Sequence, residues 1–182
     1  MFEFIATIDL NILLWVQENL RFDLVTALLE PATEVGSIVL ALMAVYLMIK
    51  GQQCEKIIGI TAFVSAGVEV VMVNGFLKNI IARQRPFVVS DEVMPLVNIL
   101  SEFSFPSGHT ALAFAMAFVL YRFLPKKYGV VAILIAMMVG FSRVYLGVHY
   151  PSDVFGGIVI AYAASKMAKV VVQRICLSKN LS

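Results

Sequence analysis

The chain contains two histidines, and the residues around the first, His109, are of the types that bind phosphate. Pro106, Ser107 and Gly108 precede it and a long apolar run over residues 110–124 follows, so a helix is predicted to start here. A helix start has unpaired backbone N–H groups and partial positive charge, which favour an anion such as phosphate. His109 could then protonate a leaving oxygen as a general acid, while the Ser107 hydroxyl and the Gly108 N–H bind equatorial oxygens.

The second histidine, His149, stands four residues before Asp153, with Pro151 between them at the predicted start of another helix. Asp153 can accept a hydrogen bond from one ring nitrogen of His149 and leave the other nitrogen as a nucleophile. An aspartate orients the histidine of a catalytic triad in the same way, although here the histidine itself would attack. The spacing therefore predicts a nucleophile on His149 that Asp153 positions.

Three basic residues, Lys78, Arg85 and Arg143, lie at the ends of apolar segments that are predicted to meet on one side. A charge near the core of a bilayer costs roughly 3 kcal/mol or more, so such charges cluster for a functional reason. Three cations around one point predict an anionic ligand, and guanidinium groups match the geometry of phosphate oxygens. The residue types together predict cleavage of a phosphate group at a membrane face.

These residues fall in three segments, 78–86, 106–109 and 142–153, with the patterns K-x6-R-P, P-S-G-H and S-R-x5-H-x3-D. The segments resemble, at every position and in the same order, the signature motifs of the type 2 phosphatidic acid phosphatase (PAP2) superfamily. The resemblance implies a helical membrane enzyme that removes phosphate from lipid phosphates or diphosphates through a phosphohistidine on His149, without a metal or another cofactor. It also implies that Asp153 orients His149, that His109 is the acid, and that five residues bind phosphate: Lys78, Arg85, Ser107, Gly108 and Arg143.

Within the superfamily, the short length, single compact domain and outward-facing site are most similar to the small bacterial undecaprenyl-diphosphate phosphatases. This step is family analogy, and phosphatidylglycerophosphate and phosphatidic acid are alternative substrates. A lipid phosphotransferase would use the same site, and an anion transporter or channel could use the same cations. A zinc site of His109, His149 and Asp153 is a further alternative, although three adjacent cations would repel a divalent ion.

The composition indicates an integral membrane protein. Hydrophobic residues make up 60% of the 182 residues, charged residues make up 14%, and the mean hydropathy is +0.90, whereas soluble domains are about half apolar and about a quarter charged. The length favours one domain over residues 1–182, and a net charge of +2 gives no reason to expect a nucleic-acid partner. Residues 1–20 lack a basic start, so we expect no signal peptide, and we expect Cys54 and Cys176 to be free thiols.

Apolar periodicity predicts an all-α, polytopic membrane helix bundle with five to six transmembrane helices. Residues 1–20 carry several polar residues at helical spacing, so they form either an interfacial helix or a first, weak span. Residues 82–105 form an outer loop, which is either a lipid gate or a segment resting at the interface. A helix is predicted over residues 24–49, with kink points at Pro31 and Gly36, and its span proper covers residues 30–49. The other spans are predicted over residues 57–81, 107–124, 129–148 and 152–172.

The distribution of Lys and Arg residues predicts the orientation in the membrane. Nine of the fourteen lie on one side, which we expect to be cytoplasmic: Lys50, Lys56, Arg122, Lys126, Lys127, Lys166, Lys169, Arg174 and Lys179. The other five lie toward the opposite side with both histidines and Asp153: Arg21, Lys78, Arg83, Arg85 and Arg143. We therefore expect a multi-pass protein of the plasma (inner) membrane whose site faces the extracytoplasmic side.

Four further charged residues are not among the positions of the three motifs and are expected to have other roles. Arg83 is expected to be a surface anchor rather than a ligand. Glu69, in the middle of a predicted span, is expected to be a hydrogen-bonded residue of the bundle, or else to help order Lys78. Glu30 and Glu34 are expected to line the outer mouth of the site.

Overall fold

The computed structural model of the chain describes residues 2–97 and 103–179, with side chains over residues 4–97 and 103–170. Every regular element within these ranges is helical, as the apolar periodicity predicts. The elements are α1 (Phe2–Leu20), α2 (Asp23–Lys50), α3 (Gln53–Val70), the π-helical segment η1 (Val71–Leu77), α4 (Lys78–Ile81), α5 (Pro86–Val89), α6 (Gly108–Phe123), α7 (Lys126–Tyr145) and α8 (Pro151–Lys179).

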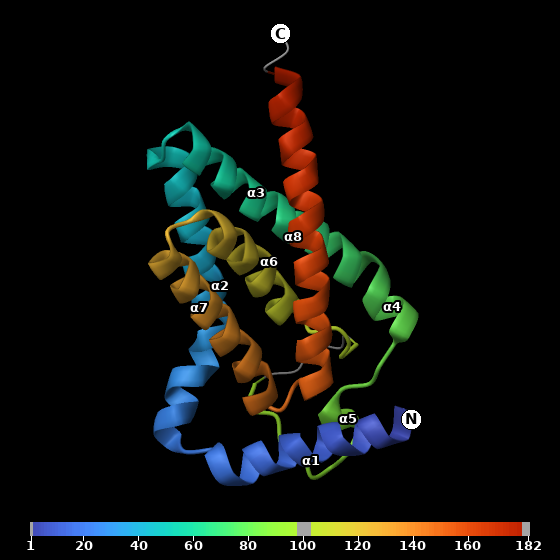
Figure 1. The fold of residues 1–182 in the computed structure, drawn as a ribbon. Helices are drawn as coiled ribbons and strands as arrows, with labels where there is room; N and C mark the ends of the chain where they lie inside the picture. Colours follow the sequence, from blue (N-terminus) through green and yellow to red (C-terminus); the bar gives the residue numbers. More distant parts are fainter. Residues whose placement is uncertain (1, 98–102, 180–182) are drawn as a thin grey trace.

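Five long helices, α2, α3, α6, α7 and α8, form a bundle (Figure 1). Helix α6 packs against the four others, so it occupies the centre. Small side chains allow helices to approach closely where there is little hydrophobic driving force between them, as in a membrane. The core follows this rule, since alanines fill much of it: Ala44, Ala62, Ala66, Ala113, Ala115, Ala117, Ala132, Ala136 and Ala161.

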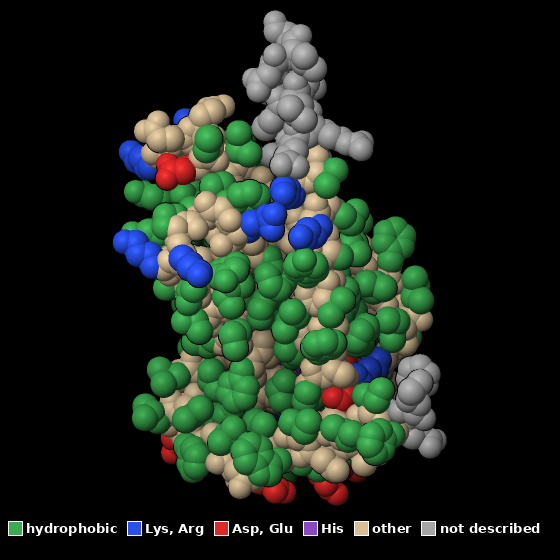
Figure 2. Space-filling model, viewed as in Figure 1, with side chains coloured by type: hydrophobic (Ala, Val, Ile, Leu, Met, Phe, Trp, Pro, Cys, Tyr) green, Lys and Arg blue, Asp and Glu red, His purple; other side chains and the backbone are tan. Residues whose placement is uncertain are grey.

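The surface of the bundle is apolar where a bilayer would surround it. Apolar stretches within Asp23–Lys50, Gln53–Val89 and Lys126–Tyr145 are long enough to cross a membrane, and α6 is a shorter apolar helix. Hydrophobic side chains cover the middle of the face shown in Figure 2, with Lys and Arg mainly above them and acidic residues at the lower edge. Leu42, Leu134 and Phe155 are each more than half exposed, which suits contact with lipid rather than water. The prediction of an all-α membrane bundle is confirmed.

The structure adds detail to the predicted helices. Helix α2 begins at Asp23, one residue before the predicted helix over residues 24–49, and continues through Pro31. Helix α3 continues into η1 and α4, and the predicted loop over residues 82–105 contains the short helix α5. A π-helical turn holds more residues than an α-helical turn and is frequent near functional sites. Because η1 ends directly before Lys78, it changes the face of the helix from which Lys78 projects.

Helix α1 crosses the end of the bundle instead of running alongside the other helices (Figure 1). It contacts α7 and α8 near the turn that joins them. Leu13 and Val16 are buried against the bundle, whereas Phe4 and Trp15 are 70% and 57% exposed. The helix therefore covers one end of the bundle and has a second apolar side that faces outward.

A close contact between α6 and α8 fixes the position at which α6 begins. A Cβ atom on Gly157 would lie 2.8 Å from the carbonyl oxygen of Ser107 and 3.3 Å from the backbone nitrogen of Ala111. Both are backbone atoms, which cannot turn aside as the end of a side chain can. Gly67 on α3 offers a contrast, because a Cβ atom there would have no neighbour within 4 Å.

We expect Gly157→Ala to lower the melting temperature by about 5 °C, because overpacking a close helix contact costs about 1–3 kcal/mol. The matched control Gly67→Ala should leave the melting temperature unchanged or raise it slightly, since alanine is the better helix former. Thermal unfolding of both variants in the same detergent provides the measurement. Equal melting temperatures for the two variants would contradict the close approach of α6 and α8.

Candidate active site

The three motif segments meet at the end of the bundle that α1 covers. Lys78 opens α4, and Arg85 directly precedes α5. Ser107 and Gly108 stand at the start of α6. The third segment comprises the last turn of α7, the turn that follows it and the first turn of α8, and it carries Arg143, His149 and Asp153.

Two contacts join the segments directly. The backbone N–H of Ser107 donates a hydrogen bond of 3.1 Å to the backbone carbonyl of Asp153, which ties the start of α6 to the start of α8. The Nζ atom of Lys78 lies 3.9 Å from the position that a Cβ atom on Gly108 would take. Lys78 thus approaches the start of α6, where the sequence predicts a phosphate. The structure brings all three predicted segments into one site.

His149 lies at the floor of this site and is only 2% exposed. Its Nδ1 atom is 3.4 Å from Oδ2 of Asp153, so the predicted pairing of the two residues is present. Its Nε2 atom is 3.5 Å from Nη1 of Arg85, which also donates a hydrogen bond of 3.1 Å to the carbonyl of Val148. With a proton on Nδ1 shared with Asp153, Nε2 presents its lone pair on the side of Arg85.

The environment of His149 keeps its imidazole neutral. Burial lowers the pKa of His149 to about 4; the contact with Asp153 opposes the shift, and the positive charges of Arg85 and Arg143 add to it. A neutral imidazole has the lone pair that a nucleophile needs, whereas an imidazolium has none. His149 is therefore in the reactive protonation state throughout the neutral pH range.

Asp153 is fully buried and receives hydrogen bonds from several segments of the chain. The hydroxyl of Ser104 donates to Oδ2 over 2.5 Å, and the backbone N–H of Tyr150 donates to the same oxygen over 2.9 Å. Nη1 of Arg83 donates to Oδ1 over 2.7 Å. Ser104 and Arg83 are thus parts of the site that the motif analysis did not include. Ser104 stands two residues before Pro106, and nothing in its spacing distinguishes it.

The expectation that Arg83 is a surface anchor is wrong. Its guanidinium forms two ion pairs of 2.7 Å, one with Asp153 and one with Asp9 of α1, and its side chain is only 23% exposed. It also stacks over the ring of Tyr150, at 3.9 Å from the centroid. Although burial acts against the charge, these two carboxylates raise the pKa of Arg83 above its ordinary value. Asp9 and Arg83 are 74 residues apart in the sequence. The spacing of residues within one segment therefore cannot predict that they pair.

Asp9 is itself buried and connects α1 to the start of α8. Its side chain is 5% exposed, and it accepts hydrogen bonds from the backbone N–H and the hydroxyl of Ser152 as well as from Arg83. The sequence carried one signal of this role, because Asp9 interrupts the apolar periodicity of residues 2–20. A buried charge in an apolar helix requires a partner. That partner is Arg83.

His109 stands at the entrance of the site, opposite Glu34 of α2. Its Nε2 atom is 3.4 Å from Oε1 of Glu34, and the two side chains are 38% and 73% exposed. The charges of Arg143 and Lys78 lie within electrostatic range of its ring. Glu34 therefore lies beside a predicted site residue, whereas Glu30 is simply exposed. His109 is the more accessible of the two histidines, since the side chain of His149 is only 3% exposed.

Arg143 projects from the last turn of α7 toward α2. Its Nη1 atom is 3.3 Å from the hydroxyl of Thr33, which in turn bonds the hydroxyl of Ser142 at 2.7 Å. Its Nε atom is buried and has no hydrogen-bond partner among the described residues. A guanidinium with a buried, unused donor is suited to an anionic ligand.

The hydroxyl of Ser107 bonds a residue of the helix that it precedes. Ser107 is fully buried, and its hydroxyl is 2.8 Å from the hydroxyl of Thr110 in the first turn of α6.

Glu69 is a buried acid without a complete set of hydrogen bonds. It is 1% exposed, and its Oε2 atom has no hydrogen-bond partner within the part of the chain that the structure describes. The expectation of a hydrogen-bonded Glu69 is thus not met at this oxygen.

The acidic and imidazole groups of the site form two separate pairs, His109 with Glu34 and His149 with Asp153. Among the described side chains, no three His, Cys, Asp or Glu residues come together in a group that could hold a metal ion. Around these pairs stand three cations and the start of α6. This arrangement can bind a phosphate, present a neutral nucleophile to it and supply a proton from a second imidazole.

The low pKa of His149 predicts how stability depends on pH. The unfolded chain takes up a proton on His149 below about pH 6.5, whereas the folded chain does so only near pH 4. The folded state is therefore destabilised by up to about 3 kcal/mol as the pH falls through this window. We therefore compare the melting temperatures of His149→Gln and wild type at several pH values. The melting temperature of the variant minus that of wild type should increase by about 6 °C or more when the pH is lowered from 7 to 4. A difference that stays constant over this range would contradict a buried, neutral His149.

The Arg83 ion pairs predict a large effect of a residue outside the motif positions. Arg83→Gln leaves two buried carboxylates without their cation, and we expect a loss of about 3 kcal/mol in the free energy of unfolding. The neighbouring exposed residue provides the control, since Gln84→Ala should change it by less than about 0.5 kcal/mol. Thermal unfolding compares the two variants.

A double variant tests the ion pair itself. Asp9→Asn combined with Arg83→Gln should lower the free energy of unfolding by less than the sum of the two single changes, because the two residues are in contact. Additive losses would contradict the ion pair.

The chain is similar in sequence to known lipid phosphatases. The chain is 32% identical over 124 residues to the undecaprenyl-diphosphatase BcrC of Bacillus subtilis, in an alignment that covers 67% of this chain and 61% of that protein. It is 43% identical over 96 residues to the phosphatidylglycerophosphatase B of the same organism, covering 47% of this chain and 44% of that one. The matched part thus spans less than two thirds of these curated relatives.

A solved structure extends the similarity to the whole fold. The crystal structure of LpxE from Aquifex aeolicus superposes with a TM-score of 0.76 at 28% identity, covering 87% of this chain and 93% of that one. The model of the PAP2 superfamily matches residues 57–175, a range that contains all three motif segments. With these segments folded into one site, the chain belongs to the PAP2 superfamily.

Proposed function

We propose that the protein is a lipid phosphatase that hydrolyses a lipid phosphate or diphosphate through a phosphohistidine on His149, without a metal ion. The observation that carries the proposal is the geometry of His149, which is neutral and buried, has Nδ1 beside Asp153 and has Nε2 beside Arg85. This arrangement supplies an oriented nucleophile next to a cation for the phosphate. The names of the relatives, both lipid phosphatases, support the same reaction.

The reaction proceeds in two balanced steps. In the first, the Nε2 lone pair of His149 attacks the terminal phosphorus, the bond from phosphorus to the bridging oxygen breaks, and His109 gives its proton to the departing oxygen. In the second, His109 accepts a proton from water, whose oxygen attacks the phosphorus; the bond from phosphorus to Nε2 breaks, the electron pair returns to His149, and inorganic phosphate is released. The cations Lys78, Arg85 and Arg143 bind the phosphate oxygens, and Ser107 and Gly108 stabilise the transition state from the start of α6. Asp153 holds the imidazole in the reactive tautomer.

Undecaprenyl diphosphate is the substrate that we favour. The relative named as an undecaprenyl-diphosphatase aligns with 67% of the chain, whereas the phosphatidylglycerophosphatase aligns with 47%. Phosphatidylglycerophosphate and phosphatidic acid place the same terminal phosphate in the same site, so they are the alternatives. A phosphotransferase would share the first step and pass the phosphate from His149 to an acceptor other than water.

We propose an orientation in which the site faces the extracytoplasmic side of the plasma (inner) membrane. The distribution of Lys and Arg supports it, because most of these residues gather at the end of the bundle opposite the histidines. We further propose that residues 1–182 act as one domain, with α1 as an interfacial helix. Its outward apolar side, with Phe4 and Trp15, is typical of a helix that lies at the surface of a bilayer.

Phosphate release by the purified chain in detergent with excess EDTA tests the proposal. We expect the highest kcat/KM for undecaprenyl diphosphate in a panel with phosphatidylglycerophosphate and phosphatidic acid. His149→Gln should lower kcat by about 10⁴-fold or more, because it removes the nucleophile. Substrate labelled in its terminal phosphate should leave an acid-labile label on the wild-type chain and none on His149→Gln.

The other outcomes separate the alternatives. Full inhibition by EDTA would favour the zinc site, and a label that passes to an added alcohol without release of phosphate would favour a transferase. Anion flux in liposomes without hydrolysis would favour a transporter or channel. Arg122→Gln is the matched control, because it removes a cation at the other end of the bundle, and it should retain full activity.

A further inference from the structure

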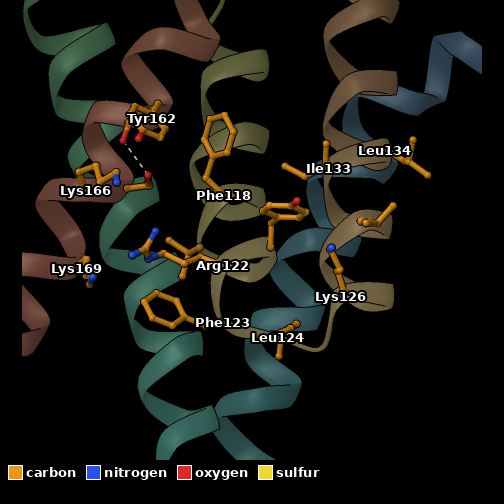
Figure 3. A pocket seen from close by; sticks show the side chains of 14 residues that line it. Phe118, Arg122, Phe123, Leu124, Lys126, Ile133, Leu134, Tyr162, Lys166 and Lys169 are labelled. Carbon is orange, nitrogen blue, oxygen red and sulfur yellow. Dashed lines mark hydrogen bonds between the residues drawn. The ribbon is translucent and has the colours of Figure 1, made fainter.

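A second polar feature lies at the end of the bundle opposite the histidines. A cavity of about 800 Å³ opens between the end of α6, the start of α7 and the second half of α8. Figure 3 shows its lining, with Lys166 and Lys169 projecting from α8, Arg122 extending from α6 on the same side, and Lys126 across the cavity on α7. The volume falls within the usual range of small-molecule sites. We call this cavity the basic groove.

The charge of the basic groove is entirely positive. Its described lining contains four cations, Arg122, Lys126, Lys166 and Lys169, and no Asp or Glu. Within the part of the chain that the structure describes, none of the four forms an ion pair. Arg122 and Lys166 instead lie over aromatic rings, at 5.9 Å from Phe123 and 5.0 Å from Tyr162. Four like charges around one cavity repel one another, so an anion among them would be stabilised.

The walls of the basic groove are apolar. Phe118, Ile133 and Leu134 line it toward the middle of α6 and α7, above Arg122 and Lys126 in Figure 3, and Ser165 donates its hydroxyl to the carbonyl of Tyr162. The groove therefore combines an apolar surface within the bundle with a cationic rim at its end. A ligand that fits both parts has an apolar body and an anionic head.

The general excess of Lys and Arg at this end of the bundle does not account for the groove. Lys50, Lys56 and Lys127 belong to the same excess but line no part of it. A second cavity of about 530 Å³ at the same end, between α2, α3 and the turn after α6, has Glu55 in its lining and neither Lys nor Arg. The cations are thus concentrated at one of two neighbouring apolar cavities.

We propose that the basic groove binds an anionic phospholipid of the leaflet opposite the histidines. The phosphate of the head group lies among Arg122, Lys126, Lys166 and Lys169, and the acyl chains lie along the apolar wall. The lipid is bound and not cleaved, because the groove contains no histidine, serine nucleophile with a base, or acid in its described lining. Charge complementarity selects anionic over zwitterionic head groups.

Lipid binding to the purified full-length chain, measured by native mass spectrometry, tests this inference. The probes are dioleoyl phosphatidylglycerol, which carries a net negative charge, and dioleoyl phosphatidylcholine, which carries none. Wild type should bind phosphatidylglycerol at least about tenfold more tightly, because the choline of phosphatidylcholine adds a positive charge that the cations of the groove repel. The triple variant Arg122→Gln, Lys166→Gln, Lys169→Gln should lose this preference.

Two further triple variants are the controls. Lys50→Gln, Lys56→Gln, Lys127→Gln removes the same number of charges outside the groove and should keep the preference. Arg122→Lys, Lys166→Arg, Lys169→Arg preserves the charges of the groove and should also keep it, which separates loss of charge from loss of folding. Equal preference in wild type and in the glutamine variant of the groove would overturn the proposal.

The site with the histidines also binds phosphate, so it must be tested as the location of the lipid. Lys78→Gln with Arg143→Gln removes cations there and should leave the preference for phosphatidylglycerol intact. Loss of the preference in this variant, with the preference intact in the groove variant, would place the lipid in the histidine site and overturn the inference. Phosphate release by the groove variant, measured in parallel, reports on the proposed phosphatase reaction independently of lipid binding.

Discussion

The carboxylate of Asp153 is the group on which the arrangement of the site depends. It is fully buried, and a buried charge is stable only when hydrogen bonds and an opposite charge surround it. Ser104, Arg83 and the N–H of Tyr150 meet this need from three different segments, and His149 lies against the same oxygen as two of them. Satisfying one carboxylate thus holds the imidazole of His149, the loop before α6 and the segment after α4 in fixed positions.

The burial that makes Asp153 require hydrogen bonds and a counter-charge also determines the protonation state of His149. The same low-dielectric surroundings disfavour a second charge, so the pKa of His149 falls to about 4 even though a carboxylate is adjacent. Desolvation is the largest cause of this shift, and the charges of Arg85 and Arg143 act in the same direction. The imidazole is therefore neutral although it stands among cations.

The sequence predicted the parts of the site that lie within short segments. The pairing of His149 with Asp153 follows from a spacing of four residues at a helix start, and the position of Gly108 follows from its neighbours Pro106 and Ser107. The all-helical bundle follows from apolar periodicity in the same way. Each of these features is local, so the order of residue types is sufficient to reveal it.

The features that the sequence did not predict depend on tertiary contacts. Arg83 resembles an interfacial anchor in its own segment, and only the fold places it between Asp9 and Asp153. The π-helical segment before Lys78 has no turn residue or proline to announce it, since its backbone is set by packing. Glu34 is expected at the outer mouth of the site, but its pairing with His109 is not, because the two residues are some 75 positions apart and no periodicity links them.

Asp9 connects α1 to the residues around Asp153, although α1 precedes the part of the chain that matches the superfamily. The helix donates no residue to the phosphate, but its carboxylate holds Arg83 and Ser152, and both border Asp153. A displacement of α1 would remove one carboxylate from Arg83 and leave Asp153 to pair with it alone. Helix α1 crosses the end of the bundle with an apolar side facing outward. The position of α1 and the orientation of His149 are therefore linked through two ion pairs of one arginine.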